Sequence, residues 1–137
     1  MIVIMEIIKL MQLCDGWLKS WTGNNPDQLI AFYTEDAYYQ DPAYPQGLKG
    51  VNQIISYFRR LLAANPNWKW EREELYPTEK GFVLKWNARI PVGSEVIEEK
   101  GMDIVEVRNN RICRNEVYFE RVKLLSKLKK TPWEILT

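Results

Sequence analysis

The stretch Tyr33–Pro42, YTEDAYYQDP, decides how the rest of the chain is interpreted. Its residues alternate as they do in a β-strand, so Ala37, Tyr39 and Asp41 lie on one face of a strand over residues 37–41. A carboxylate therefore shares its face with an alanine and a tyrosine. Asp41 is either a solvated turn residue in front of a proline or an acid held inside a pocket. The second alternative would make the chain a candidate enzyme.

Length and composition predict one globular domain. The chain has 137 residues, of which 46% are hydrophobic and 27% charged, and this is enough to bury a single core. We expect one domain over residues 1–137, with a core over about 4–121 and a C-terminal tail over 122–137. The six Trp, seven Tyr and four Phe are an excess of aromatic residues. Such rings are typical of ligand pockets and interfaces, and also of a tryptophan-rich core.

Charge and residue usage exclude several function classes. The net charge is +1 and the charged residues are interspersed, whereas nucleic-acid binding needs a concentrated basic face. The chain has no histidine, so Ser–His and Cys–His nucleophile pairs are excluded. Cys14 and Cys113 are far apart, which argues against a zinc site. We expect no metal and no cofactor, because no Gly-rich phosphate loop is present either.

The same features predict a location. Two isolated cysteines favour a reduced, cytoplasmic protein. The apolar first residues, MIVIMEIIKLMQLC, are interrupted by Glu6 and Lys9. Neither a charged segment before them nor a small-residue cleavage site after them is present. We therefore expect no signal peptide and no membrane span.

The first half of the chain predicts three helices. Apolar residues at three-to-four spacing predict the first helix over residues 4–21. Asn25 and Pro26 begin a short second helix that reaches about residue 36. A strand over 37–41 and a loop over 42–47 follow. A third helix begins at Gly50 and ends before Pro66.

From residue 67 the pattern has period two and predicts four antiparallel strands. They cover residues around 68–70, 82–90, 95–108 and 111–121, and Asn109–Asn110 is a hairpin turn. Helices and strands are thus segregated, which indicates the α+β class. We expect a cone-shaped α+β barrel with three N-terminal helices packed against a curved, mostly antiparallel sheet around a pocket. The tail over 122–137 shows no clear pattern.

Several stretches in this order resemble one superfamily. They are WLKSWTGNNPDQL, LIAFYTEDAYYQDP, GLKGVNQIISYFRRL and GMDIVEVRNNRICRNEVYFER. Together they resemble the nuclear transport factor 2-like (cystatin-like) superfamily, and within it the SnoaL-like and ketosteroid isomerase-like proteins. The combination is specific for the fold and much less so for activity, since this scaffold carries isomerases, cyclases, hydrolases and binding modules.

The resemblance implies roles for two carboxylates. Asp41 before Pro42 matches the isomerase's general base, and Asp103 in MDIVEV matches its oxyanion-hole acid. That isomerase is the standard example of a carboxylic acid kept neutral by an apolar site. Burial of Asp103 beside Val105 would raise its pKa. The alternatives from the sequence alone are a turn residue for Asp41 and an exposed strand residue for Asp103.

Other positions of the isomerase pattern are changed. Trp17 replaces the oxyanion tyrosine, and it is either a supporting hydrogen-bond donor or a core residue. Tyr33 matches a second tyrosine of the network, while Phe58 replaces a third. These losses argue against steroid isomerisation itself. SnoaL-like cyclisation needs less of the tyrosine network.

The resemblance also predicts a cavity wall. Alternation in the last strand puts Asn115, Val117 and Phe119 on one face, and the resemblance implies that this face points inward. Trp86 is either another wall residue or a contact with a partner subunit. NWKWERE, residues 67–73, is interpreted as a sheet face outside the site. The predicted ligand-binding residues are Tyr33, Tyr39, Phe58, Trp86, Asn115, Val117 and Phe119.

Two functions remain open. In the first, the chain is a cofactor-independent isomerase or cyclase in which Asp41, Asp103 and Trp17 move a proton on a hydrophobic carbonyl compound. In the second, it is a non-catalytic small-ligand-binding or dimerisation module. Alternating Trp and Tyr residues favour self-association, and members of this fold commonly pair through the sheet. We therefore expect a homodimer and a hydrophobic small-molecule ligand, with no nucleic-acid or membrane partner.

Overall fold

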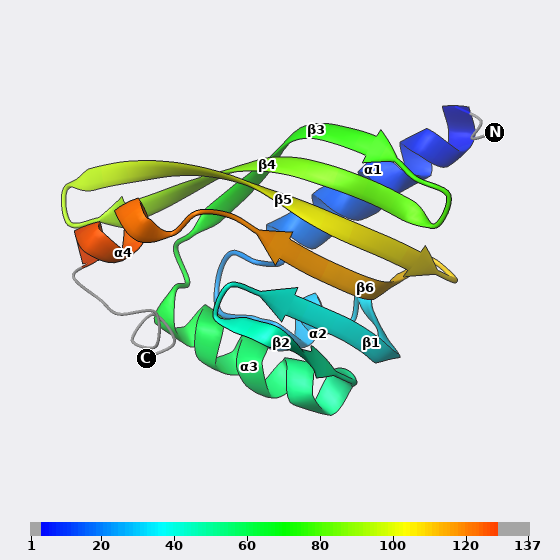
Figure 1. The fold of residues 1–137 in the computed structure, drawn as a ribbon, viewed down its shortest axis with the longest axis horizontal. Helices are drawn as coiled ribbons and strands as arrows, with labels where there is room; N and C mark the ends of the chain where they lie inside the picture. The colour runs from blue at the N-terminus through cyan, green and yellow to red at the C-terminus, as the bar shows by residue number, and fades with distance from the viewer. Residues whose placement is uncertain (1–3, 129–137) are drawn as a thin grey trace.

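The computed structural model describes residues 4–128. Four helices and six strands follow one another along the chain (Figure 1). Their bounds are α1 Ile4–Lys19, α2 Pro26–Ile30, β1 Tyr33–Asp41, β2 Tyr44–Lys49, α3 Val51–Ala64, β3 Lys69–Pro77, β4 Gly81–Val92, β5 Glu95–Arg108, β6 Arg111–Tyr118 and α4 Val122–Leu128.

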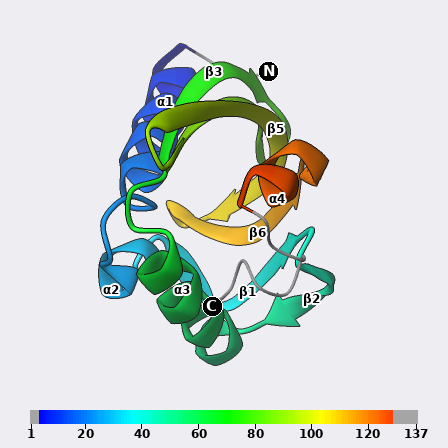
Figure 2. The ribbon, with the colours of Figure 1, turned by 90° about the vertical axis from the view of Figure 1, so that its left-hand side faces the viewer.

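The six strands form one sheet in the order β2-β1-β6-β5-β4-β3. All neighbours are antiparallel except β1 and β6, which are parallel. The sheet is strongly curved but not closed, and Figure 2 shows the long strands arching over the interior. The α+β class and the curved, mostly antiparallel sheet of the expected fold are confirmed.

Helices cover the concave face of this sheet. α1 packs against β3, and α3 packs against β1, β2 and the short helix α2. The buried residues of α3 include Ile54, Tyr57 and Phe58, which recur at helical spacing as an amphipathic helix requires. One hydrophobic cluster joins these helices to the inner face of the sheet. The interior between helices and sheet is where a site can form.

Several local predictions are confirmed. The Asn25 side chain accepts the Gln28 backbone N–H at 3.2 Å, and Pro26 is the first helical residue. Asn109 and Asn110 have φ values of 53° and 62°, the left-handed pair that a tight two-residue hairpin requires. β5 spans the predicted residues 95–108.

Other boundaries differ. The predicted second helix ends early, at Ile30, and Tyr33 and the exposed Glu35 and Asp36 lie on β1. The predicted loop over 42–47 is mostly strand β2, which pairs with β1. Neighbouring-strand hydrogen bonds decide both cases, and a local pattern does not reveal them.

The ends of the described chain also differ from expectation. Residues 122–128 of the predicted unpatterned tail form α4, and Leu124 is fully buried. The rest of that tail lies outside the described residues. In α1, the first predicted apolar positions Ile4 and Ile8 are exposed, because this end of the helix extends beyond the sheet (Figure 1). Among the described helices, none combines the length and the apolar character that crossing a bilayer requires.

Candidate functional site

A partly open, mostly apolar cavity lies between the helices and the concave face of the sheet. Its volume is about 80 Å³, several times what one water molecule needs. Eight of its wall residues are aromatic and two are carboxylates. The wall consists of Trp17, Leu18, Trp21, Tyr39, Asp41, Pro42, Ala43, Tyr57, Leu61, Leu62, Asn65, Trp68, Trp70, Trp86, Asp103, Val117, Phe119 and Arg121.

Asp41 is both a turn residue and a cavity residue. It ends β1, and its Oδ1 accepts the backbone N–H groups of Ala43 at 2.8 Å and Tyr44 at 3.1 Å. Its Oδ2 accepts the hydroxyls of Tyr39 at 2.8 Å and Tyr57 at 2.5 Å. Four donors and no acceptor around one carboxyl group is the pattern of an ionised carboxylate. Asp41 therefore closes the turn and also lines the cavity, and at 7% exposed it is not the solvated turn residue of the first interpretation.

Asp103 lies on β5 in a different environment. Its side chain is 4% exposed, and it accepts the Trp86 indole N–H at 2.8 Å and the Asn115 amide at 2.9 Å. Burial raises the pKa of Asp103 to about 7. The two hydrogen bonds oppose this rise, and the charge on Asp41 adds to it. Asp103 can therefore gain or lose a proton near neutral pH.

A chain of hydrogen bonds behind the cavity fixes how Asp103 is held. The Trp17 indole donates to the Tyr33 hydroxyl at 3.0 Å, and that hydroxyl donates to Asn115 Oδ1 at 2.8 Å. An indole can only donate, so Tyr33 must donate onward and Asn115 must present its oxygen to Tyr33. The Asn115 amide nitrogen is thereby directed at Asp103. The direction of every bond in this chain follows from Trp17.

The three tyrosines of the site remain protonated donors. Burial raises the pKa of Tyr33, Tyr39 and Tyr57 well above its usual value. For Tyr39 and Tyr57 the neighbouring Asp41 charge raises it further. None of these hydroxyls can act as a base near neutral pH.

A glycine makes room for the contact between Trp86 and Asp103. Trp86 on β4 pairs with Gly101 on β5, and the next inner position of β5 is Asp103. A Cβ atom built on Gly101 would lie in the volume that the Trp86 ring occupies. The ring therefore lies over Gly101 and reaches Asp103, which sets one wall of the cavity.

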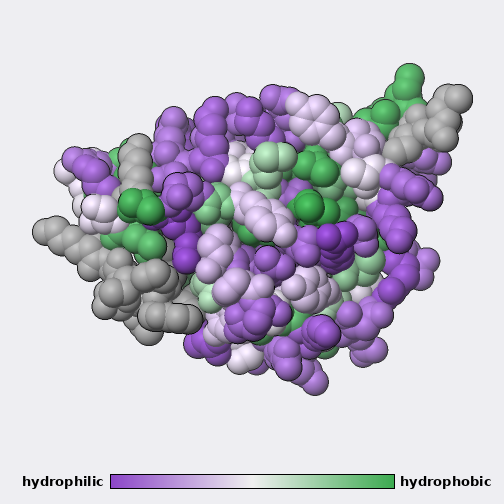
Figure 3. Space-filling view, in the orientation of Figure 1, coloured by the Kyte–Doolittle hydropathy of each residue, from purple (hydrophilic) through white to green (hydrophobic). Residues whose placement is uncertain are grey.

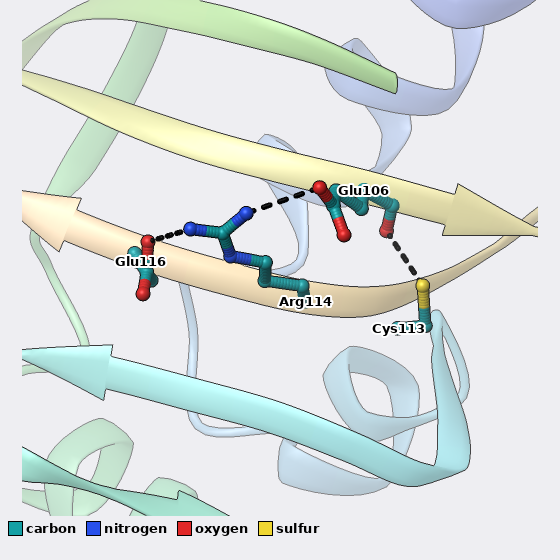
Figure 4. Close-up of polar contacts among 4 residues, drawn as sticks. All are labelled: Glu106, Cys113, Arg114 and Glu116. Carbon is teal, nitrogen blue, oxygen red and sulfur yellow. Dashed lines mark hydrogen bonds and ion pairs between the residues drawn. The ribbon is translucent and has the colours of Figure 1, made fainter. Parts of the chain in front are cut away.

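The outer side of β6 carries a separate polar cluster (Figure 4). Arg114 donates to Glu106 on β5 at 3.0 Å and to Glu116 on its own strand at 2.6 Å. Cys113 donates to the Glu106 backbone oxygen at 3.4 Å, next to the register shift between the two strands. Partly exposed ion pairs of this kind contribute modestly to stability. The cluster links β5 and β6 at the strand position before Asn115.

Arg121 is the one basic side chain on the cavity wall among the residues that the structure describes. It follows β6, is half-buried, and donates to the Pro42 carbonyl oxygen at 3.1 Å. Its charge lowers the pKa of Tyr57, against the larger effect of burial. The guanidinium therefore acts on the Asp41 side of the cavity.

The predicted residues divide into wall and support. Seven of them line the cavity, which for Trp86 favours the wall over a subunit contact. Tyr33, Phe58 and Asn115 are also buried but do not line it, which corrects the expectation that they face the ligand. Inward alternation identifies the buried face of an element, but it does not separate a wall from the layer behind it. The seven wall residues are Trp17, Tyr39, Asp41, Trp86, Asp103, Val117 and Phe119.

Sequence analysis missed other wall residues. Trp68 and Trp70 line the cavity, so the interpretation of residues 67–73 as a sheet face outside the site is wrong for these two. Tyr57 was missed although it follows Ile54 at helical spacing, a signal that could have identified it. Arg121 was missed as well, although it continues the inward alternation of Asn115, Val117 and Phe119 in the strand predicted over 111–121.

The two cysteines take no part in the site. Both are free, and burial followed by the Asp15 charge raises the pKa of Cys14 to about 12. Its thiol therefore stays protonated. Within residues 4–128, no three Cys, Asp or Glu side chains gather as metal ligands.

Solved structures with the same fold are numerous, at low sequence identity. A protein of ketosteroid isomerase-like fold from Catenulispora acidiphila, solved in complex with trimethylamine, matches with a TM-score of 0.75 and 19% identity, covering 88% of this chain and 94% of that one. A protein described as a SnoaL-like polyketide cyclase from Shewanella putrefaciens matches at 0.72 and 15%, covering 94% and 96%. TerC, co-crystallised with polyporic acid, matches at 0.73 and 8%, covering 89% and 99%. At these identities the likeness shows the fold alone.

A search of curated protein sequences finds no match to the chain. The sequence profile of the SnoaL-like domain does match, over residues 15–115. This segment contains α1 from Asp15 onward, the whole of α2 and α3, and the sheet as far as Asn115. It thus includes both cavity carboxylates, and it covers well over half of the chain. The protein belongs to the SnoaL-like domain family.

Proposed function

We propose that the cavity binds a small apolar carbonyl compound and that Asp103 exchanges a proton with its carbonyl oxygen. The observation that carries the proposal is a carboxyl group on an aromatic cavity wall with a pKa of about 7. A general acid–base group works best when its pKa lies near the operating pH. The Trp86 and Asn115 bonds leave each Asp103 oxygen one further lone pair, so the acidic proton can point into the cavity.

The second carboxylate has a different part in this proposal. Asp41 provides a fixed negative charge on the same wall and is the base available for a proton on carbon. Its lone pairs already accept four donors, so less of its electron density is available to a substrate. We therefore assign the larger share of the rate to Asp103. The reaction class is isomerisation or cyclisation of a carbonyl compound without a cofactor.

The test compares three matched Asp→Asn variants on a panel of cyclic enones followed by absorbance. We expect Asp103→Asn to lose about 100-fold or more in kcat, the usual contribution of an acid–base group, and Asp41→Asn to lose less. The Asp41 substitution keeps the turn, because the new amide oxygen can accept the two backbone N–H groups. The tyrosine hydroxyls can reorient so that their oxygens accept hydrogen bonds from the amide N–H groups. Asp27→Asn, at an 85% exposed surface carboxylate, is the control and should match the wild type.

A specific observation favours the non-catalytic alternative. The saturated hydrogen bonding of Asp41 is what a structural residue needs and a catalytic base does not. If the wild type turns over no enone but binds an apolar fluorescent probe in the cavity, the protein is a binding module. If it does neither, the proposal fails.

We also propose that the protein forms a homodimer through the outer face of the sheet. Met102 and Tyr118 are direct partners on β5 and β6, and they are 46% and 48% exposed. In Figure 3 apolar side chains gather near the centre of this face and polar ones surround them. Light scattering should give the mass of a dimer, and Tyr118→Lys should shift it to the monomer. A monomeric wild type would refute the proposal.

A further inference from the structure

The tryptophans of this chain are concentrated in one place. The sequence has six, and five of them line the cavity. Trp70 contacts both Trp21 and Trp68, with ring centroids 5.9 and 6.0 Å apart, and Trp21 also contacts Trp17 at 6.3 Å. Trp86 on β4 contacts Phe119, the residue after β6, with ring centroids 5.3 Å apart. A purely apolar ligand would be served equally well by leucine and isoleucine, which have no electron-rich face.

The charges around this aromatic wall are mostly negative. Asp41 and Asp103 line the cavity, against Arg121 alone on the basic side among described residues. Glu99 adds a third carboxylate on the concave face, because it pairs with the buried Ala88 and paired residues point to the same side. Its Oε1 is buried and has no hydrogen-bond partner. Among the described residues, the concave face therefore carries three carboxyl groups against one guanidinium, and Asp103 adds its negative charge when it is ionised.

We infer that the ligand carries a compact organic cation, a tertiary or quaternary ammonium group, which lies against the tryptophans of the cavity. Indole rings attract cations through their negative faces, and tryptophan is the strongest of the aromatic residues in this respect. An alkylated ammonium suits a wall with few free acceptors, because it needs few or no hydrogen bonds. The neighbouring carboxylates add Coulomb attraction. The inference rests on the proposed function and refines its ligand: the carbonyl compound would join an ammonium group to its apolar part.

Arg121 does not oppose this assignment. Its hydrogen bond to the Pro42 carbonyl oxygen holds it at the turn after β1, and its charge acts on Tyr57 beside Asp41. It therefore balances the Asp41 end of the cavity. In the contacting group, Trp21 follows α1, Trp68 directly precedes β3 and Trp70 lies on β3, whereas Arg121 follows β6. A cation can be placed against these rings without replacing an existing ion pair.

The test uses a pair of compounds of the same shape. Choline and 3,3-dimethylbutan-1-ol differ in one atom, a charged nitrogen in place of a neutral carbon. We expect choline to bind about tenfold or more tightly to the wild type, as desolvated cation–aromatic contacts imply. Binding is followed by tryptophan fluorescence and by calorimetry. Trp70→Leu, at a half-buried position, should abolish the preference, while Tyr76→Leu, an exposed aromatic on the same strand, should keep it.

Every outcome separates the two proposals. Equal affinities for choline and its neutral analogue would overturn the cation inference and leave the cavity as an apolar site, as the proposed function requires. A choline preference that survives Trp70→Leu would also overturn it, because Trp70 joins Trp21 and Trp68 in the contacting group against which the cation is placed. If neither compound nor any cyclic enone binds, the proposed function fails as well. Trp70→Phe keeps an aromatic ring and should retain part of the preference, which guards against a simple folding defect.

Discussion

At the scale of single residues, the decisive property of this protein is the difference between its two buried aspartates. Asp41 accepts four donors, two of them backbone N–H groups. Asp103 accepts two, and burial outweighs them. Burial favours the neutral acid and hydrogen bonds favour the anion, and at Asp103, with only two donors, burial prevails.

This difference is directly measurable. Carboxyl carbon chemical shifts recorded against pH should show Asp103 titrating with a pKa of about 7 rather than the 3.8 of an aspartate in water. Addition of an ammonium ligand should lower this pKa, because a bound cation stabilises the carboxylate. The Asp103→Asn spectrum assigns the resonance. A midpoint near 4 for Asp103 would contradict the burial that the structure shows.

A paired substitution tests the direction of the hydrogen-bond chain. Asp103→Asn alone leaves one acceptor for two donors, Trp86 and Asn115, and an unpaired buried donor costs about 1–3 kcal/mol. Adding Asn115→Asp restores a full set. The new carboxylate at position 115 can accept from Tyr33 and from the amide at position 103, whose oxygen can accept from Trp86.

We therefore expect the double variant to recover most of the free energy of unfolding that Asp103→Asn loses, measured by denaturant titration. Proton transfer should stay lost, because position 115 does not line the cavity. Asn115→Asp alone is the control, since it places two carboxyl groups against each other and should destabilise the protein. Additive effects of the two substitutions would mean that the chain of bonds does not run as described.

At the scale of the elements, the neighbouring strands β4 and β5 form the acid site together. Trp86 crosses Gly101 to reach Asp103, so the glycine is part of the site although it has no side chain. The first two strands have a comparable relation, in which Asp41 closes the turn between them. Each carboxylate is thus positioned by several elements: Asp103 by Trp86 of β4 and Asn115 of β6, and Asp41 by the turn before β2 and by tyrosines of β1 and α3.

Gly101→Ala should show this dependence. The added methyl group would overlap the Trp86 ring, and overpacking of a core costs about 1–3 kcal/mol. Displacing the ring should also weaken its bond to Asp103, which opposes the effect of burial, so the pKa of Asp103 should rise further. Chemical denaturation and the carboxyl titration measure the two effects. Gly93→Ala, at a hairpin with open space around the glycine, controls for the loss of a glycine, although its φ of 60° adds a backbone cost of its own.

How far the sequence predicts these elements depends on the range of the interactions involved. Helix caps and the Asn109–Asn110 hairpin depend on neighbours in the chain, and they were predicted correctly. The parallel pairing of β1 with β6 depends on a partner that is distant in sequence. Strand β2 depends on pairing with β1 at the edge of the sheet. The alternation in β1 identified Asp41 as inward. It could not reveal that Tyr57 donates to it from α3.

At the scale of the whole molecule, the cavity joins parts of the chain that no local pattern connects. Trp17 from the first helix, Trp70 from the third strand and Arg121 after the last strand all line this one cavity. The resemblance to a family predicted the arrangement of helices and sheet, and within it the two carboxylates. In the sequence, the tryptophans were recognisable only as an excess in composition. Which of them line the cavity depends on the curvature of the sheet, and no local pattern gives that curvature.

The buried acid also makes the stability of the whole fold depend on pH. Asp103 has a higher pKa in the folded state than in the unfolded state, so the folded protein binds more protons between the two values. Stability from this group is complete below about pH 4 and is lost as the pH rises through about 7. A rise from 3.8 to about 7 corresponds to roughly 4 kcal/mol, at 1.36 kcal/mol per pH unit.

Comparison of the wild type with Asp103→Asn isolates this effect from the other titrating groups. The variant carries a constant cost for its mispaired amide, but it has no ionisation at position 103. Its free energy of unfolding should therefore rise by roughly 4 kcal/mol relative to that of the wild type between pH 4 and pH 8. The variant thus becomes relatively more stable as the pH rises. Urea titrations at several pH values measure this difference. A difference that stays flat with pH would mean that Asp103 ionises in the fold as it does in the unfolded chain, and the acid–base proposal would then lose its physical basis.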